Sequence, residues 1–144
     1  MKRYIWIVCI LLCSIMAASA VGAEDFDGTR PLLVSVIRAV ECMPDGTCRE
    51  VPLASVELPQ FLKIDFSKKT IRPADDDDKT PATVIERQEV VDGKLILQGA
   101  EDGYDKVRDG LGWTMAISEA TGQVVLTASG DQVAFVVFGA ALPL

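Results

Sequence analysis

Apolar and polar residues alternate with a period of two over much of the final third of the chain. Three apolar runs lie there, separated by two short turn sequences, Glu-Ala-Thr-Gly and Gly-Asp-Gln. In the first run Trp113, Met115 and Ile117 fall on one face, because successive side chains of a strand point to opposite faces. Apolar runs joined by short turns are typical of an antiparallel meander, so we expect three consecutive strands between residues 113 and 139.

The last of these runs, Val-Ala-Phe-Val-Val-Phe-Gly, is apolar on both of its faces. Phe135 and Val137 point one way, and Val136 and Phe138 point the other way. A strand that is apolar on both faces is normally a central strand covered on both sides. We therefore expect both faces of this strand to be buried.

Apolar runs also precede the meander, and Asp92-Gly93 between two of them is the strongest hairpin signal in the chain. No window of eleven residues shows a helical period. The sequence predicts one all-β domain over 32–144, either an up-and-down barrel or a two-sheet sandwich of about seven to eight strands. The runs before the meander are 32–41, 51–58, 61–66, 82–91 and 94–99.

The amino terminus has the pattern of a secretory signal peptide. Two basic residues follow Met1, residues 4–16 form an uncharged apolar core, and small residues precede both Ala20 and Ala23. We expect cleavage after one of these two alanines, which makes 1–23 the signal peptide and the protein exported, either periplasmic or secreted. An uncleaved membrane anchor is the alternative. The polar stretch 24–31 is expected to be a mobile leader.

Charge narrows the classes of partner. Beyond residue 23 the chain has 12 Lys and Arg, since two of its 14 lie before that point, against 21 Asp and Glu, a net charge of −9. An acidic surface repels nucleic-acid phosphates and anionic lipids. We expect no nucleic-acid partner and no membrane contact after cleavage, which leaves an unknown protein or small molecule as the partner.

Two cysteines, Cys42 and Cys48, follow the predicted signal peptide. The intervening Met-Pro-Asp-Gly-Thr contains a strong turn sequence, which brings the two residues face to face. An even number of cysteines in an exported chain favours a disulfide. A redox-active pair usually has two intervening residues rather than five, so we expect a structural bond.

Four consecutive aspartates, Asp75, Asp76, Asp77 and Asp78, lie between prolines in the stretch 73–81. Such a run cannot pack and is expected to form an exposed loop. Calcium loops space their aspartates at alternate positions around a glycine, which this run does not do. These four residues are therefore weak metal candidates, and we expect no metal or cofactor.

The sequence contains no histidine, which removes Ser-His-Asp and Cys-His catalysis and histidine-ligated metals. No phosphate-binding glycine loop or nucleophile elbow is present. We assign no catalytic residue and expect a protein that is not an enzyme, with a carboxylate-dependent hydrolase as the alternative. The aromatic residues Trp113, Phe135 and Phe138 are expected to fill the core or, if the sheet closes, to line a cavity.

Five motifs occur in a fixed order along the chain: Cys42-x-x-Asp45-Gly46-x-Cys48, Leu58-Pro59-Gln60-Phe61 leading to Ile64-Asp65, Leu97-Gln98-Gly99-Ala100-Glu101, Trp113 with Ile117 and Gly122, and Phe135-Val136-Val137-Phe138-Gly139. Together they resemble a family of short uncharacterised exported proteins of Gram-negative bacteria. Members of that family end in Phe-Gly-Ala-Cys, whereas this chain has Ala141 in place of the cysteine. The resemblance implies export and carries no activity.

These observations lead to one functional expectation and two alternatives. We expect a non-enzymatic exported β-protein, a periplasmic binding or accessory module whose ligand the sequence does not name. The alternatives are the carboxylate-dependent hydrolase and a structural or assembly protein that pairs with a partner through a sheet edge.

Overall fold

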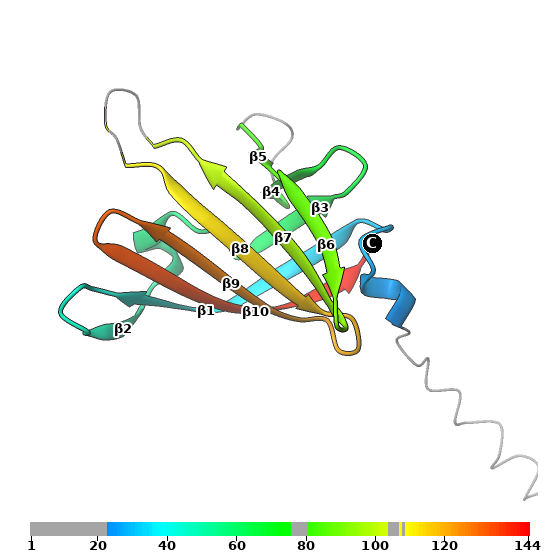
Figure 1. Ribbon diagram of the computed structural model, residues 1–144, viewed down its shortest axis with the longest axis horizontal. Helices are drawn as coiled ribbons and strands as arrows, with labels where there is room; N and C mark the ends of the chain where they lie inside the picture. The colour runs from blue at the N-terminus through cyan, green and yellow to red at the C-terminus, as the bar shows by residue number, and fades with distance from the viewer. Residues whose placement is uncertain (1–22, 76–80, 104–106, 108) are drawn as a thin grey trace, which may run out of the picture.

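The computed structural model describes residues 23–75, 81–103, 107 and 109–144. These residues form an all-β fold with two short 3-10 helices and ten strands in one antiparallel sheet, which confirms the predicted class (Figure 1). The strand number exceeds the seven to eight expected. The predicted signal peptide lies outside the described residues apart from Ala23. Within the described ranges, no helix is both long and apolar enough to cross a membrane.

The elements follow one another along the chain with short connections. They are η1 (Ala23–Phe26), β1 (Leu32–Cys42), β2 (Cys48–Val51), η2 (Leu53–Val56), β3 (Phe61–Asp65), β4 (Thr70–Pro73), β5 (Thr83–Val84), β6 (Arg87–Val91), β7 (Lys94–Glu101), β8 (Leu111–Ser118), β9 (Gln123–Gly130) and β10 (Val133–Pro143).

The strands run in the order β5-β4-β3-β1-β10-β9-β8-β7-β6, with β2 paired to the second half of β1. The meander predicted over 113–139 is confirmed as β8, β9 and β10, which are neighbours in sequence and in space. The sheet curls into a half-barrel instead of splitting into two layers, so the sandwich alternative is not what forms (Figure 1). A β-bulge between Val36 and Arg38 interrupts the long β1–β10 ladder. Bulges bend a strand and increase its local twist, which favours the curl.

The run 82–91 forms two strands, and this accounts for part of the undercount. The backbone N–H of Ile85 donates to Lys69 O, and the N–H of the next residue, Glu86, donates to Gln98 O. Neighbouring residues therefore bond to separate parts of the sheet, the turn before β4 and the strand β7. Because β5 pairs with β4 and β6 pairs with β7, this bent segment bridges the two ends of the curl.

One hydrophobic core fills the inside of the curl. Trp113, Met115 and Ile117 are all buried, which confirms the face expected from their alternation. Their neighbours in β7 and β9 alternate in the same way, because inward residues of paired strands share a face. The other buried core residues are Phe26, Leu32, Val34, Val36, Ala39, Leu62, Ile64, Phe66, Ile71, Ile85, Leu95, Leu97, Val124, Ala128, Val137 and Ala141.

Two residues of the segment 24–31, Phe26 and Gly28, are buried against the rest of the fold, and the mobility expected of this segment stays a prediction. Phe26 is only 2% exposed, and its ring lies so close to Gly122 that a Cβ atom there would be 2.6 Å from Cζ. The side chain of Gln88 donates to Gly28 O at 3.2 Å. The polar residues of this segment masked the effect of one large apolar ring, whose burial stabilises a fold by roughly 1.5–3 kcal/mol.

The outer face of β10 is open, which corrects a second expectation. Val137 is buried and Phe135 packs partly against the core, but Phe138 on the opposite face is 42% exposed. The strand is central, as expected, since it lies between β1 and β9. A single curled sheet has no second layer, so nothing among the described residues covers the outward side chains.

The hairpin of β1 and β2 carries the predicted disulfide. Cys42 and Cys48 are directly paired across the two strands, and their sulfur atoms are 2.00 Å apart. In the turn between them, Thr47 N–H donates to the Asp45 carboxylate at 2.8 Å. Gly46 has a φ of 86°, a left-handed conformation that glycine adopts without strain.

Candidate functional site

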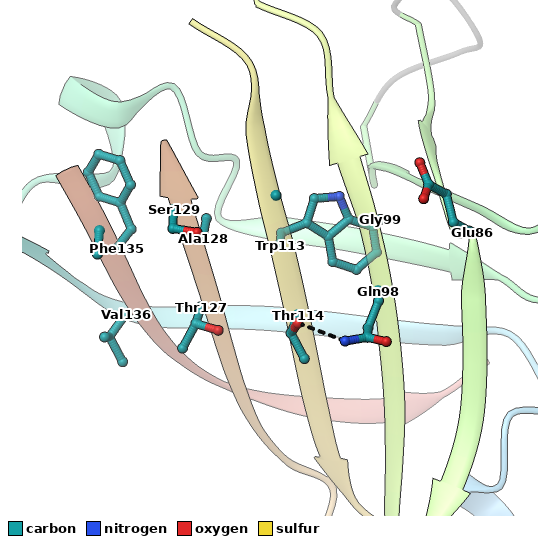
Figure 2. A pocket seen from close by; sticks show the side chains of 12 residues that line it. Glu86, Gln98, Gly99, Trp113, Thr114, Thr127, Ala128, Ser129, Phe135 and Val136 are labelled. Atoms are coloured by element: carbon teal, nitrogen blue, oxygen red, sulfur yellow. Dashed lines mark hydrogen bonds between the residues drawn. The ribbon is translucent and has the colours of Figure 1, made fainter. Parts of the chain in front are cut away.

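A hollow of about 540 Å3 crosses four neighbouring strands, β7 to β10. It lies where β7 and β9 end and where β8 and β10 begin, so residues far apart in the sequence meet there (Figure 2). Its lining comes from three successive rows of cross-strand partners and from Glu86 beside them.

The middle row belongs to the inner face and alternates small and large side chains. Gly99, Trp113, Ala128 and Phe135 are partners in successive strands. The missing side chain of Gly99 makes room for the indole ring, because a Cβ atom there would lie 2.6 Å from Cζ2 of Trp113. The row fixes the two aromatic residues at one end of the curl.

The second row belongs to the outer face and is uncharged. Gln98, Thr114, Thr127 and Val136 are successive partners, and they lie side by side across the strands in Figure 2. The Gln98 amide donates to the Thr114 hydroxyl at 3.3 Å. Hydroxyl and amide groups can each donate and accept hydrogen bonds, so three of the four side chains offer both functions.

The third row is also on the outer face and is made of small residues, Gly112, Ser129 and Ala134. Gly112 has no positive φ, and no atom lies within 4 Å of the place where its Cβ would be. Neither backbone conformation nor packing therefore requires glycine there. Glycine inside a strand is normally unfavourable, and it often marks a point where a ligand or another chain approaches closely.

Glu86 borders the hollow beside β7, held there by its backbone hydrogen bond to Gln98 O. It is the only carboxylate among the lining residues that the structure describes, and no lysine or arginine joins it. The electrostatic character of the hollow is therefore polar with one negative charge at its edge.

Trp113 has an unpaired polar atom. The residue is 6% exposed, and its Nε1–H has no hydrogen-bond partner within the described part of the chain. Native proteins seldom leave a buried donor unpaired, because doing so costs roughly 1–3 kcal/mol. This residue lines the hollow and belongs to the core at once, whereas the sequence presented these as alternatives.

The other two aromatic candidates separate. Phe135 lines the hollow with Trp113, whereas Phe138 lies on the outer face, two residues beyond Val136 along β10. The polar row of Gln98, Thr114 and Thr127 was not predicted from the sequence. Their positions opposite buried neighbours could have identified an outward polar face, but only the register shows that they line up across three strands.

The acidic run does not take part in the hollow. Asp75 is exposed and borders a separate depression beside Phe61, while Asp76, Asp77 and Asp78 lie outside the described residues. Over the described ranges, no group of three or more Cys, Asp or Glu side chains gathers as a metal site would require.

Three carboxyl groups elsewhere have a lowered pKa, and each belongs to a local turn. Side-chain and backbone hydrogen bonds from Thr29 lower the pKa of Asp27. The backbone N–H of Thr47 lowers the pKa of Asp45, and the Ser67 hydroxyl lowers the pKa of Asp65. All three are structural, since none lines the hollow.

Comparisons with protein-family models, with curated proteins and with solved structures found no match for this chain. The resemblance to short exported proteins of Gram-negative bacteria therefore stays a prediction, and the site has to be interpreted from its own geometry.

Proposed function

We propose that this protein is a non-enzymatic exported binding module that holds its ligand in the hollow across β7–β10. The observation that supports this proposal most directly is Gly112, which lies on the floor of the hollow beside the polar row. Neither the backbone conformation nor the packing requires a glycine at this position. Approach of a ligand to the sheet surface explains why a side chain is absent there.

The charge of the lining supports binding over hydrolysis. Carboxylate-dependent glycoside hydrolysis needs two carboxyl groups facing each other, roughly 5–10 Å apart. Glu86 is the one acid among the described lining residues, so the hollow lacks the second carboxyl group that this chemistry needs. The same hollow offers several neutral groups that donate and accept hydrogen bonds, which suits recognition.

The sheet edges give less support to an assembly protein. β5 has two residues, β2 has four, and ion pairs join Arg49 to Glu41 and Arg38 to Glu50 along the β2 hairpin. Short and charged edges disfavour pairing with a strand from another molecule. β6 also has charged side chains, Arg87 and Glu89, which are hydrogen-bonded to each other.

Export is part of this proposal and rests on two observations. The first is the pattern of residues 1–23, and the second is the Cys42–Cys48 bond, because disulfides persist in oxidising compartments. Mass spectrometry of the protein from periplasm or medium tests it. The mass of a chain that begins at residue 21 or 24 supports export, and an uncleaved cytoplasmic chain contradicts it.

The binding proposal is tested by filling the hollow. Gly112→Val adds a β-branched side chain to open space on the floor, so the fold should be kept and ligand excluded. Gly130→Val is the matched control: its Cβ would meet ordinary contacts at 3.5–3.6 Å, it lies at the end of β9, and it does not line the hollow.

The measurement is a set of backbone amide spectra of the exported protein, recorded with neutral saccharides, acidic saccharides and short peptides. We expect at least one of these probes to shift the amides of β7–β10 in the native chain and in Gly130→Val, with the shift absent in Gly112→Val. Equal shifts in both variants, or no shift with any probe, would contradict the hollow as a binding site.

A further inference from the structure

We infer that a second copy of this chain covers the hollow while no ligand is bound, and that the two copies pack face to face through the outer surface of β7–β10 and β1. This inference rests on the proposed binding function and adds the regulation of that site, because dissociation of the dimer exposes the hollow. It is drawn from an exposed apolar row, from the β-bulge beside that row and from the charges at the ends of the rows.

An apolar row crosses the outer face next to the polar row. Its members, Ile96, Ala116, Val125 and Phe138, are successive cross-strand partners in β7 to β10. Each of them lies two residues along its strand from a member of the polar row or from Val136, so both rows share the outer face. Phe138 and Val125 are 42% and 39% exposed. A contiguous exposed apolar patch often marks a surface on which another protein packs.

The β-bulge in β1 extends this apolar row. Val36 and Ala39 on either side of the bulge are buried, whereas Ile37 is 69% exposed and Arg38 is the direct partner of Phe138. Two consecutive residues therefore point away from the core, which the alternation of a regular strand does not allow. The bulge thus adds a large apolar side chain to the outer face near Phe138.

A second sheet on this face would cover β10 on both sides. A strand that is apolar on both faces is normally covered on both, yet the outer face of β10 is open in the single chain. Two sheets pack face to face at a distance of about 10 Å. The small residues Gly112, Ser129 and Ala134 allow the facing backbone to approach closely. The partner copy therefore accounts for a glycine that the single chain does not require.

The charges at the ends of the rows favour a second copy as the partner. At the β6 end, Glu89 continues the apolar row and Arg87 continues the polar row. At the other end, Arg38 continues the apolar row and Glu50, the partner of Val40, continues the polar row. The signs at the two ends are therefore reversed. A two-fold axis parallel to the strands turns each row end for end, which brings Glu89 opposite Arg38 and Arg87 opposite Glu50 of the other copy.

The same axis also matches the middle of the face. It brings Phe138 opposite Ile96 of the other copy, so that large apolar side chains meet. It brings Thr114 opposite Thr127, and each hydroxyl can donate or accept a hydrogen bond. The outward residues of β7–β10 in the apolar row, the polar row and the row of Gly112 are uncharged. The dimer therefore buries no unpaired charge at its centre.

The size of the face predicts a weak dimer. Five strands about 4.8 Å apart and three outward rows about 7 Å apart span about 19 Å by 14 Å. An interface of this size lies at the small end of protein interfaces, so we expect dissociation at micromolar concentrations. A weak dimer suits a cover, because a ligand that binds only the open chain shifts the equilibrium towards that chain.

Sedimentation of the exported protein between about 1 µM and about 500 µM measures this association. We expect a monomer–dimer equilibrium that Phe138→Ser weakens about tenfold or more, because it removes the aromatic side chain of the apolar row. Phe61→Ser is the matched control, since Phe61 is 46% exposed on β3, outside the face. Equal effects of the two variants would overturn the inference. A chain that stays monomeric would also overturn it and would leave the face to a partner of another sequence.

An exchange of charges tests the orientation of the two copies. Arg38→Glu and Glu89→Arg should each weaken the dimer about tenfold or more, because like charges then lie opposite each other. An equimolar mixture of the two variants should restore association as a heterodimer. Both altered side chains are exposed, and amide spectra show whether each variant keeps its fold. Lys63→Glu in β3 makes the same change of charge outside the face and should have no effect. Failure of the mixture to associate would overturn the face-to-face arrangement.

Titration with the saccharide and peptide probes separates this inference from the proposed function. A probe that shifts the amides of β7–β10 should also dissociate the dimer, because both occupy the same outer face. A probe that binds the dimer without dissociating it, or that binds a chain found to be monomeric, would keep the binding function and overturn the cover. A dimer through this face that responds to no probe would overturn the binding function and, with it, the regulation.

Discussion

Gly99 lies directly opposite Trp113 in the β7–β8 ladder, and a Cβ atom at position 99 would lie 2.6 Å from Cζ2 of the indole and 2.5 Å from Val84 O. Contacts this short do not occur in proteins, and one of the two partners is backbone. Gly99 is therefore the position where the bent segment between β5 and β6, the strand β7 and the buried ring approach one another.

The first prediction is that Gly99→Ala destabilises the protein by about 1–3 kcal/mol, the usual cost of overpacking a filled core. Urea unfolding measures the change. Gly112 directly precedes Trp113 in β8, and no atom lies within 4 Å of the place where its Cβ would be. Gly112→Ala should therefore leave the stability unchanged or raise it. Equal effects of the two substitutions would contradict the packing described at position 99.

The second prediction separates the ring of Trp113 from its N–H group. Trp113→Ala removes a side chain that is 6% exposed, so we expect a loss of roughly 3–5 kcal/mol. Trp113→Phe keeps an aromatic ring and removes the unpaired Nε1–H, which offsets part of the lost contact area. Chemical unfolding of both variants should therefore show Phe to be much milder than Ala. A shift below about 1 kcal/mol for Ala would contradict a core role.

The third prediction compares two phenylalanines that the sequence placed in the opposite environments. Phe26→Ala should cost roughly 3–5 kcal/mol, because the ring is 2% exposed against Gly122. Phe138→Ser should change stability by less than about 1 kcal/mol, because 42% of that residue is already exposed. Thermal unfolding of both variants ranks them, and the reverse order would contradict the described packing.

These two residues show what pattern reasoning could predict and what it could not. The all-β class and the last three strands followed from alternation and turn sequences, which are local signals. The burial of Phe26 depends on contact with Gly122, almost a hundred residues later in the chain, and no local signal encodes that contact. The exposure of Phe138 depends on there being one sheet instead of two, which is a global property.

The candidate site shows the same division. Trp113 and Phe135 could be named from composition and alternation, but the polar row required the register of three hairpins. A shift of one residue in any of them would have turned Thr114 or Thr127 inward. The bend at Ile85 and Glu86 could not be predicted either, because its cause is hydrogen bonding to Lys69, in the turn before β4, and to Gln98 in β7.

The fourth prediction concerns acid stability. Hydrogen bonds from Ser67 and from the Lys68 N–H lower the pKa of Asp65, mainly through the Ser67 hydroxyl. A carboxyl group whose pKa is lower in the folded state stabilises the fold above its unfolded pKa, and this contribution disappears as the pH falls through the folded pKa. Asp65→Asn should therefore reduce the pH dependence of stability below about pH 4 and leave its slope near pH 7 unchanged.

Unfolding midpoints recorded from pH 2 to pH 7 measure that effect. Asp102→Asn is the comparison variant, because Asp102 lies in an exposed position after β7. The same loss of acid dependence in both variants would contradict a specific role for the Ser67 hydrogen bond. The Ser67→Ala variant should reproduce the behaviour of Asp65→Asn in the acid range, since it removes the principal donor.

The final prediction concerns the Cys42–Cys48 bond, which joins directly paired residues of β1 and β2 at a sequence separation of 6. A loop this short restricts the unfolded chain little, so its loss should cost roughly 2 kcal/mol on the entropic model. The ion pair of Arg49 with Glu41 and the turn hydrogen bond of Asp45 remain in the hairpin without it.

Thiol titration of the unreduced exported protein should find no free cysteine. The double variant Cys42→Ser/Cys48→Ser should fold with a lower urea midpoint and with unchanged amide shifts along β7–β10. Two free thiols in the unreduced protein would contradict the bond, and loss of the β7–β10 signals in the double variant would show that the hairpin supports the hollow as well.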